Sequence, residues 1–597
     1  MVFDMAHPAP RSNAALGDFT TSPRVLLLAA MAVVIGTGGV ASAWVLLKLI
    51  ALCTNIAYHG RLSFGPATID VTRLGWWSVL VPVGGAVIIG LMARYGSEKI
   101  RGHGIPEAME AILIGQSRIS PKVAILKPLS SAVSIGTGGP FGAEGPIIMT
   151  GGALGSLFAQ CFSMSSAERK TLLVAGAAAG MTAVFATPVA SVLLAVELLL
   201  FEWKPRSFIP VLVACVTAAV ERGWVLPVGP VFAHGGSLAL TPGMMLAACG
   251  LGLVCGLGSG VLTAMVYAAE DAFAKLPVHW AVWPAIGGVV VGVGGMIEPR
   301  ALGVGYDSIT LLLAGGLGIA LVARLLVVKA VIWAVALGSG TSGGVLAPLL
   351  IMGGALGTLV GLVLPGAGTG DWALIGMAAM MGGTMRAPLT ATMFALELTG
   401  ASGLLLPLLA ACGTSYAVTV LLLKRSILTE KVARRGHHIS REYHVDPLDL
   451  ARARDVMAAP VETLPAEMTR AGLVAFFGAA ERRRMYPVVD RAGRVVALAS
   501  RADALRFARD GVGLEASLEQ ALGPRGVVTA TEEEPLSALA DRMVEADVGR
   551  LPIVREEDGV LVGVVAREDL LRARAVRQME ERERERFLRW RGARKVA

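Results

Sequence analysis

The chain has 597 residues, of which 54% are hydrophobic and only 16% are charged, whereas ordinary soluble domains carry about 25% charged residues. Together with a mean hydropathy of +0.65, this composition excludes a plain soluble enzyme. The formal net charge is +8, and the 73 glycines and 30 prolines interrupt apolar runs, as in membrane proteins with broken helices.

The N-terminal part reads as a series of membrane segments of unequal length. Residues 1–23 lack the pattern of a signal peptide, so we expect a cytoplasmic tail there. The apolar run 25–47 is long enough to span a membrane, whereas 128–140 and 343–352 are short or broken by Gly and Pro. Broken segments at membrane depth line cavities in transporters, so we predict an all-α polytopic membrane domain with broken helices over residues 24–430.

This membrane part contains an internal repeat. The pattern Gly-x11-Pro-x8-Glu occurs at 176–197 and again at 376–397, an offset of 200 residues. Gly-x3-Pro occurs at 142–146 and again at 344–348, an offset of 202. Two tandem copies with a Gly/Pro break at matching places predict a transporter whose site lies between the copies.

Three Gly/Pro breaks, at 102–106, 142–146 and 344–348, carry the chemistry of that site. Each break places a proline where a helix would begin, and glycine lets the backbone approach a ligand. A helix N-terminus presents unpaired N–H groups and the positive end of a dipole. The breaks therefore predict binding of an anion.

The six cysteines lie in apolar segments without metal-ligand spacing, so we expect neither a disulfide nor a metal site. No catalytic triad, metal-ligand set or phosphate loop appears, so we do not expect an enzyme.

After residue 443 the composition becomes that of a soluble α/β module, and the module occurs twice. The first copy has Met485-Tyr486-Pro487-Val488-Val489, then a strand at 495–499 and Asp503. The second has Arg550-Leu551-Pro552-Ile553-Val554, then a strand at 561–565 and Asp569. Both copies resemble CBS domains, so we expect a cytoplasmic α/β CBS pair over residues 450–575, after a linker at 431–449. Residues 576–597 form a basic C-terminal tail, which fits a solvated or lipid-facing segment better than nucleic-acid binding.

The three breaks, the repeat and the CBS pair together resemble the CLC family of voltage-gated chloride channels and chloride/proton antiporters. Residues 102–106 are similar to its GSGIP motif, 142–146 to G(K/R)EGP and 344–348 to GxFxP. The resemblance implies inverted repeats, a homodimer with one anion pathway per subunit, and location in the cell inner membrane with both termini cytoplasmic.

Two carboxylates stand out by this resemblance. Glu144 occupies the position of the family's gating glutamate, and a carboxylate among helix N-termini can itself occupy an anion site. Glu202 is similar to the inner glutamate that passes protons to the cytoplasm in family exchangers, although pairing with Lys204 is the plainer alternative. Glu197 and Glu397, which mirror each other in the repeat, are interpreted as structural.

Three positions depart from the family pattern. His103 replaces the serine of GSGIP, Ala143 replaces the basic residue before the gating glutamate, and Leu428 replaces the pore tyrosine. The central site has therefore lost both side-chain hydroxyl donors. His103 either donates to the anion and acts as a pH switch, or is a neutral packing residue. The expected anion-binding residues are Gly102, His103, Gly104, Ile105, Pro106, Gly142, Ala143, Gly145, Gly344, Val345, Leu346 and Leu428.

In the CBS pair, the resemblance implies adenine-nucleotide binding through Ser500, Asp503 and Asp569. Ala566 stands where the second copy would need a hydroxyl, so we expect at most one nucleotide site, and transport itself requires no cofactor.

The leading hypothesis is exchange of chloride, or a related small anion, for protons. The alternatives are a passive pH-gated anion channel, a transporter selective for nitrate, fluoride or bicarbonate, and a membrane sensor that binds adenine nucleotide.

Overall fold

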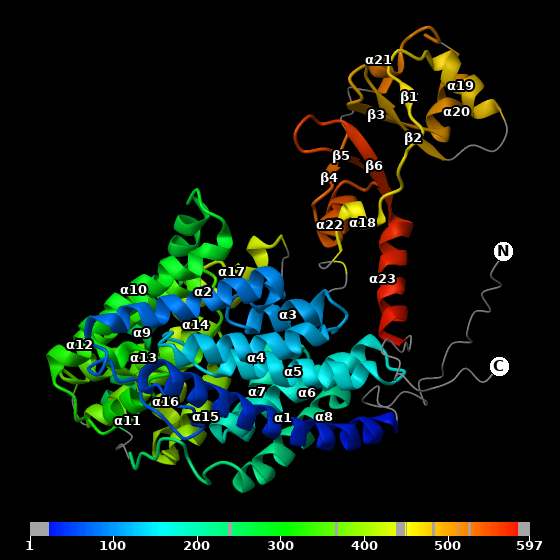
Figure 1. Cartoon of the computed structure of the whole chain (residues 1–597). Helices are drawn as coiled ribbons and strands as arrows, with labels where there is room; N and C mark the ends of the chain where they lie inside the picture. The colour runs from blue at the N-terminus through cyan, green and yellow to red at the C-terminus, as the bar shows by residue number, and fades with distance from the viewer. Residues whose placement is uncertain are drawn as a thin grey trace. The chain divides into compact units, whose positions relative to one another are not determined.

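The computed structural model describes residues 23–236, 241–364, 368–436, 448, 451–479, 484–511, 513–522 and 527–582. The chain divides into two compact units, one holding the apolar helices up to Arg435 and the other covering Gly436–Glu583 (Figure 1). The expected N-terminal tail, most of the linker and residues 583–597 lie outside the described part.

The first unit is built from two copies of the same eight elements. The first copy consists of α1 Arg24–Thr54, α2 Leu80–Tyr95, α3 Ile105–Leu113, α4 Pro121–Gly136, α5 Glu144–Gln160, α6 Ser166–Phe185, α7 Pro188–Leu194 with its π-helical extension Ala195–Leu200, and α8 Pro205–Glu221. The second consists of α9 Pro242–Ala274, α10 Trp283–Ile297, α11 Tyr306–Leu313, α12 Ile319–Gly338, α13 Leu346–Gly361, α14 Thr369–Met385, α15 Pro388–Thr399 and α16 Leu405–Leu422. A last helix, α17 Ile427–Arg434, has no counterpart in the first copy.

In the described part of the chain, seven helical segments are long and apolar enough to cross a membrane. They begin at Arg24, Gly75, Pro205, Pro242, Trp280, Ile319 and Ser402. Other apolar helices are shorter, including α13, as the Gly/Pro breaks predicted. The protein is an integral membrane protein.

The two copies meet through reciprocal contacts. The Gly142 amide donates to the Gly344 carbonyl at 3.3 Å and the Gly344 amide donates to the Gly142 carbonyl at 3.0 Å, in an antiparallel bridge. Because equivalent segments run in opposite directions where they meet, the repeats are inverted.

A second reciprocal contact involves Glu197 and Glu397. Glu397 accepts from the amides of Val189 and Ala190 at 3.0 and 2.8 Å, at the start of α7. Glu197 accepts from the amides of Leu389 and Thr390 at 3.4 and 2.8 Å, at the start of α15. Each carboxylate thus caps the positive end of the other copy's helix, which is a structural arrangement.

The second unit repeats one small sheet twice. In each sheet the first strand pairs parallel with the second, and the second pairs antiparallel with the third. Both sheets carry a register shift at the same place, between Val488 and Val489 and between Ile553 and Val554. The elements are α18 Ala453–Val456, β1 Leu464–Pro465, α19 Arg470–Gly478, β2 Met485–Val489, β3 Val495–Ser500, α20 Arg501–Asp510, α21 Leu518–Leu522, β4 Ala530–Thr531, α22 Leu536–Glu545, β5 Arg550–Val554, β6 Leu561–Ala566 and α23 Arg567–Arg582.

The reciprocal caps predict a matched pair of destabilised variants. Glu197→Ala and Glu397→Ala each leave two helix-terminal amides without their acceptor, so each should lower the free energy of unfolding by about 1–3 kcal/mol. Thermal unfolding of the detergent-purified protein measures this. The control is Glu98→Ala, whose side chain is 66% exposed and pairs with Arg101; equal melting temperatures for all three variants would contradict the capping role.

Candidate anion site and its surroundings

The three Gly/Pro breaks lie together in the first unit. Gly102 forms a parallel bridge with Ser342, and Gly142 bridges Gly344. A Cβ on Gly145 would lie 1.9 Å from the His103 carbonyl oxygen and 3.1 Å from the Gly344 Cα. Backbone therefore packs directly on backbone, and the N-termini of α3, α5 and α13 converge.

The Glu144 carboxylate lies at this convergence. Glu144 is the first residue of α5 and is fully buried. Its Oε1 accepts from the Leu346 amide at 2.5 Å and the Ala347 amide at 3.3 Å, at the start of α13. Its Oε2 is buried and has no hydrogen-bond partner among the described residues. The carboxylate thus occupies amides that could otherwise bind an anion.

Two glycines leave the space for that carboxylate. A Cβ on Gly142 would lie 1.8 Å from Glu144 Oε2, and a Cβ on Gly344 would lie 2.4 Å from Oε1. Neither position tolerates a side chain while the carboxylate stays on α13. The other apolar residues expected at the site are buried around it: Ile105, Pro106, Ala143, Val345, Leu346 and Leu428.

His103 is buried, with 2% of its surface exposed, and its Nδ1 has no partner among the described residues. It interacts electrostatically with Glu107, Lys431, Lys127 and Arg435. The plainer alternative of a histidine bonded through Nδ1 to a carbonyl is therefore not what the structure shows, and this nitrogen is available to a ligand.

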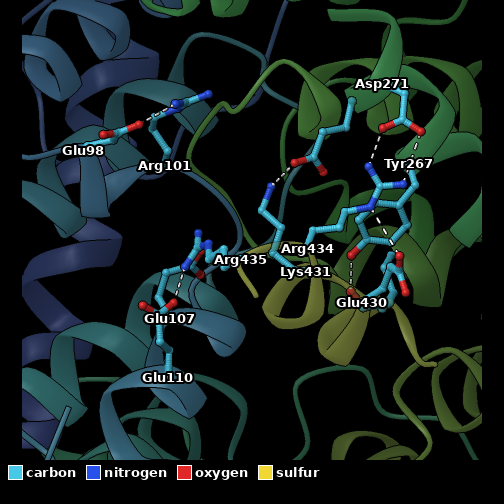
Figure 2. Close-up of polar contacts among 12 residues, drawn as sticks. Glu98, Arg101, Glu107, Glu110, Tyr267, Asp271, Glu430, Lys431, Arg434 and Arg435 are labelled. Carbon is cyan, nitrogen blue, oxygen red and sulfur yellow. Dashed lines mark hydrogen bonds and ion pairs between the residues drawn. The ribbon is translucent and has the colours of Figure 1, made fainter. Parts of the chain in front are cut away.

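Leu428 belongs to α17, which polar contacts hold against α9 and α3 (Figure 2). On the α9 side, the Tyr267 hydroxyl donates to the Ile427 carbonyl at 2.5 Å, and Arg434 pairs with Asp271. Lys431 pairs with Glu270 of α9 at 2.7 Å. These contacts fix the position of the helix that carries Leu428.

On the α3 side, Arg435 pairs with Glu107 at 2.9 Å and with Glu110 at 2.5 Å. Glu107 also accepts from the Gly104 amide at 2.8 Å. The Gly104 amide is therefore engaged within the protein, and Arg435 is linked through Glu107 to the first Gly/Pro break. Because the basic residues after 430 pair with acids of the first unit, that unit continues to Arg435, slightly beyond the predicted boundary at 430.

Glu202 lies in the loop between the π-helical segment and α8, apart from Glu144. The Ser207 hydroxyl donates to it at 2.6 Å, and Lys204 and Arg206 lie at 3.1 and 3.7 Å. Burial alone would raise the pKa of this carboxyl, but Lys170, the Ser207 hydroxyl, Arg206 and Lys204 outweigh burial and lower the pKa to about 2. Glu202 is therefore held ionised, as the alternative of pairing with Lys204 anticipated.

In the second unit, the expected nucleotide-binding residues bond to their own backbone. The Ser500 hydroxyl donates to Asp503 at 2.5 Å, and Asp503 also pairs with Arg506. Asp569 accepts from the Ala566 amide at 2.9 Å. Both aspartates stabilise the start of a helix, and nucleotide binding stays a prediction.

Two buried lysines were missed by the sequence analysis. The Lys127 ammonium donates to the carbonyls of Ile100 and Gly102, each at 2.8 Å. The Lys329 ammonium donates to the carbonyls of Ala301 and Gly303 at 2.8 and 3.0 Å and interacts electrostatically with Glu144. The two lysines are 202 residues apart, so the repeat offset itself could have revealed them.

Comparison with known proteins agrees with this geometry. The family model described as "Voltage gated chloride channel" matches residues 84–420, more than half of the chain, and the CBS domain model matches residues 524–576. The chain therefore belongs to the CLC family of voltage-gated chloride channels and transporters. Among curated relatives, it is 32% identical to a protein of Ralstonia nicotianae named "Putative chloride channel protein ClcB-like", over 58% of this chain and 82% of that protein.

A second relative is the H(+)/Cl(-) exchange transporter ClcA of Salmonella paratyphi A, 30% identical over 55% of this chain and 72% of the relative. Among solved structures, a slow cyanobacterial Cl-/H+ antiporter aligns with a TM-score of 0.60 and 21% identity, over 70% of this chain and 99% of that one. A eukaryotic CLC transporter aligns with a TM-score of 0.60 and 18% identity, over 91% and 98%. These likenesses show the fold.

The glycine frame of Glu144 predicts the effect of adding one methyl group. In Gly142→Ala the Cβ overlaps the carboxylate, so Glu144 should leave the amides of α13, and anion flux should lose the pH dependence that this carboxylate confers. Flux from proteoliposomes at several pH values measures this. Gly250→Ala is the matched control, since a Cβ there meets no atom within 4 Å; wild-type pH dependence in Gly142→Ala would contradict the overlap.

Proposed function

We propose that the protein exchanges chloride, or a related small anion, for protons across the cell inner membrane, with Glu144 as the gate. In this proposal it acts as a homodimer with a cytoplasmic CBS pair, and it is not an enzyme. The observation that carries the proposal is the bond from the Leu346 amide to the Glu144 carboxylate. A carboxylate on helix N-terminal amides competes with an anion for the same donors.

The gating step follows from this competition. When Glu144 takes up a proton, it loses the charge that the positive ends of α5 and α13 favour, and it becomes a weaker ligand for their amides. The carboxyl then leaves, and an anion takes its place on Leu346 and Ala347. Proton uptake and anion binding are thus coupled at one residue, which is the minimum that exchange requires.

The central part of the pathway relies on backbone donors and His103, since the family's serine and tyrosine are absent. Chloride is the proposed anion because the curated relatives are named for chloride. One solved structural neighbour is a CLC-type fluoride/proton antiporter, with a TM-score of 0.57 and 18% identity over 67% of this chain and 97% of that one. Fluoride, nitrate and bicarbonate are therefore the substrates to compare.

Substitution of Glu144 tests the gate. Glu144→Gln mimics the protonated side chain, so it should retain anion flux and abolish coupled proton movement. The measurement is simultaneous recording of chloride and protons from proteoliposomes loaded with one anion at a time. Proton-coupled uptake that persists in this variant would remove Glu144 from the mechanism.

A passive anion channel is the second candidate, and the environment of Glu202 favours it. A carboxylate held ionised by Lys170, Lys204 and Arg206 is poorly suited to carry protons near neutral pH. The depressed pKa means that the ionised cluster stabilises the fold at neutral pH. This stabilisation is lost only as the pH falls from about 4.5 towards about 2.

Two variants with opposite expected effects distinguish the candidates. If Glu202 relays protons, Glu202→Gln should lower proton flux severalfold with anion flux retained. Lys204→Met should raise the Glu202 pKa and increase proton flux at pH 7, because protonation becomes easier. If Glu202 is only an ion-pair partner, both variants should leave the ratio of protons to anions unchanged and should lower thermal stability together. The ratio is read from the same proteoliposome recording.

A further inference from the structure

A pocket of about 810 Å³ lies at the end of α1, away from the convergence of the Gly/Pro breaks. Its lining comes from the last turns of α1, the loop after it, and the segment 299–308 that leads into α11. At about 30 Å³ per water molecule, the pocket has room for about 25 waters. A small hydrated anion therefore fits without losing its hydration shell.

The charged residues in the lining are predominantly basic. Lys48, Arg61 and Arg300 face one carboxylate, Asp307, so the wall carries a net charge of about +2 with His59 neutral. None of the three cations forms an ion pair within the described residues. Lys48 donates to the Phe64 carbonyl, and Arg61 donates to the Asn55 amide oxygen.

The acids near this wall are already engaged. Glu298, two residues before Arg300, pairs with Arg324 at 2.8 Å. Asp70, which interacts electrostatically with His59, bonds to Thr72 and does not line the pocket. The positive charge of the wall is therefore not neutralised by the protein.

The floor of the pocket is the counterpart of the first Gly/Pro break. Gly303-Val304-Gly305 precedes α11 as Gly102-His103-Gly104 precedes α3, at an offset of 201 residues. The first glycines have φ of +60° and +88°, and the second glycines have φ of +77° and +93°. Lys329 holds the carbonyls of the pocket floor as Lys127 holds those of the first break.

The floor also leads towards Glu144. A Cβ on Gly305 would lie 2.5 Å from Ile351 of α13, the helix on which the Glu144 carboxylate rests. Tyr306, in the lining, and Lys329, beneath it, both interact electrostatically with Glu144. The pocket and the carboxylate are thus separated only by this floor.

The pocket and α17 lie at opposite ends of the 31-residue helix α1. The first residue of that helix, Arg24, pairs with Glu168, and the neighbouring Arg169 donates to the Gln116 carbonyl just after α3. Arg435, which follows α17, pairs with Glu110 of α3. The pocket lines the last turns of α1, so we refer to its side of the membrane as the outer face.

We propose that this pocket is an outer anion-collecting vestibule, in which Arg300, Lys48 and Arg61 concentrate a small hydrated monovalent anion before it reaches Glu144. The inference rests on the proposed transport function. Concave surfaces of one charge sign raise the local concentration of a counter-ion, and dissolved salt weakens the effect.

The test uses charge neutralisation at low ionic strength. Arg300→Gln and Lys48→Gln should each raise the half-saturating outer chloride concentration about three- to tenfold, with the maximal rate unchanged. Added potassium gluconate should reduce this difference from wild type. Arg73→Gln is the matched control, an exposed arginine in the loop after α1 that does not line the pocket.

A second variant tests the sign of the charge and the side of the membrane. In Arg300→Cys, a positively charged membrane-impermeant thiol reagent added outside should restore wild-type affinity, and a negatively charged one should lower affinity further. The unsubstituted protein, with its own six free cysteines, provides the baseline.

The outcomes separate this proposal from the proposed function. Absence of anion flux in the wild-type protein would overturn the transport function and, with it, the vestibule. Wild-type flux with equal half-saturation and equal salt dependence in Arg300→Gln, Lys48→Gln and Arg73→Gln would overturn the vestibule alone.

Discussion

The membrane unit depends on two helix N-termini that face each other across the pair Gly142 and Gly344. The positive dipole ends of α5 and α13 repel unless negative charge lies between them. Within the described residues, the Glu144 carboxylate supplies that charge by accepting from Leu346 and Ala347. The inverted repeat, the glycines that leave room for the carboxylate, and the neighbouring Lys329 all serve this one electrostatic arrangement. An anion can replace the carboxylate because it satisfies the same requirement.

Much of this arrangement could be predicted from the sequence. Spacing alone located the repeat, the broken helices and Glu144, because glycine and proline report directly on backbone geometry. The partners of Glu202 could only be suggested, since Lys170 and Ser207 approach it through the fold. Pairing of Arg435 with Glu107, 328 residues apart, has no local signal at all. The lysines and the Gly303–Gly305 segment did carry a signal, the repeat offset, but their residue types do not resemble a binding motif on their own.

The two buried lysines and the α17 contacts explain how loops at membrane depth keep their shape. Each lysine satisfies two carbonyls that no water reaches, which offsets the cost of burying both the charge and the carbonyls. Around the first Gly/Pro break, Glu107 adds an acceptor for the Gly104 amide and is itself held by Arg435. The backbone that would contact an anion is therefore positioned by buried ionic groups rather than by regular secondary structure.

The glutamate and its acceptor amides occupy equivalent positions in the duplicated chain. Glu144 is the first residue of α5, Leu346 is the first residue of α13, and the carboxylate of one bonds to the amide of the other. An assembly of two identical, unlinked halves would place two carboxylates across this gap or none. Two would repel and compete for one proton, and none would leave the opposed dipoles uncompensated. Covalent joining of the halves lets one side keep the acid and the other lose it, so a symmetric cradle acquires a direction.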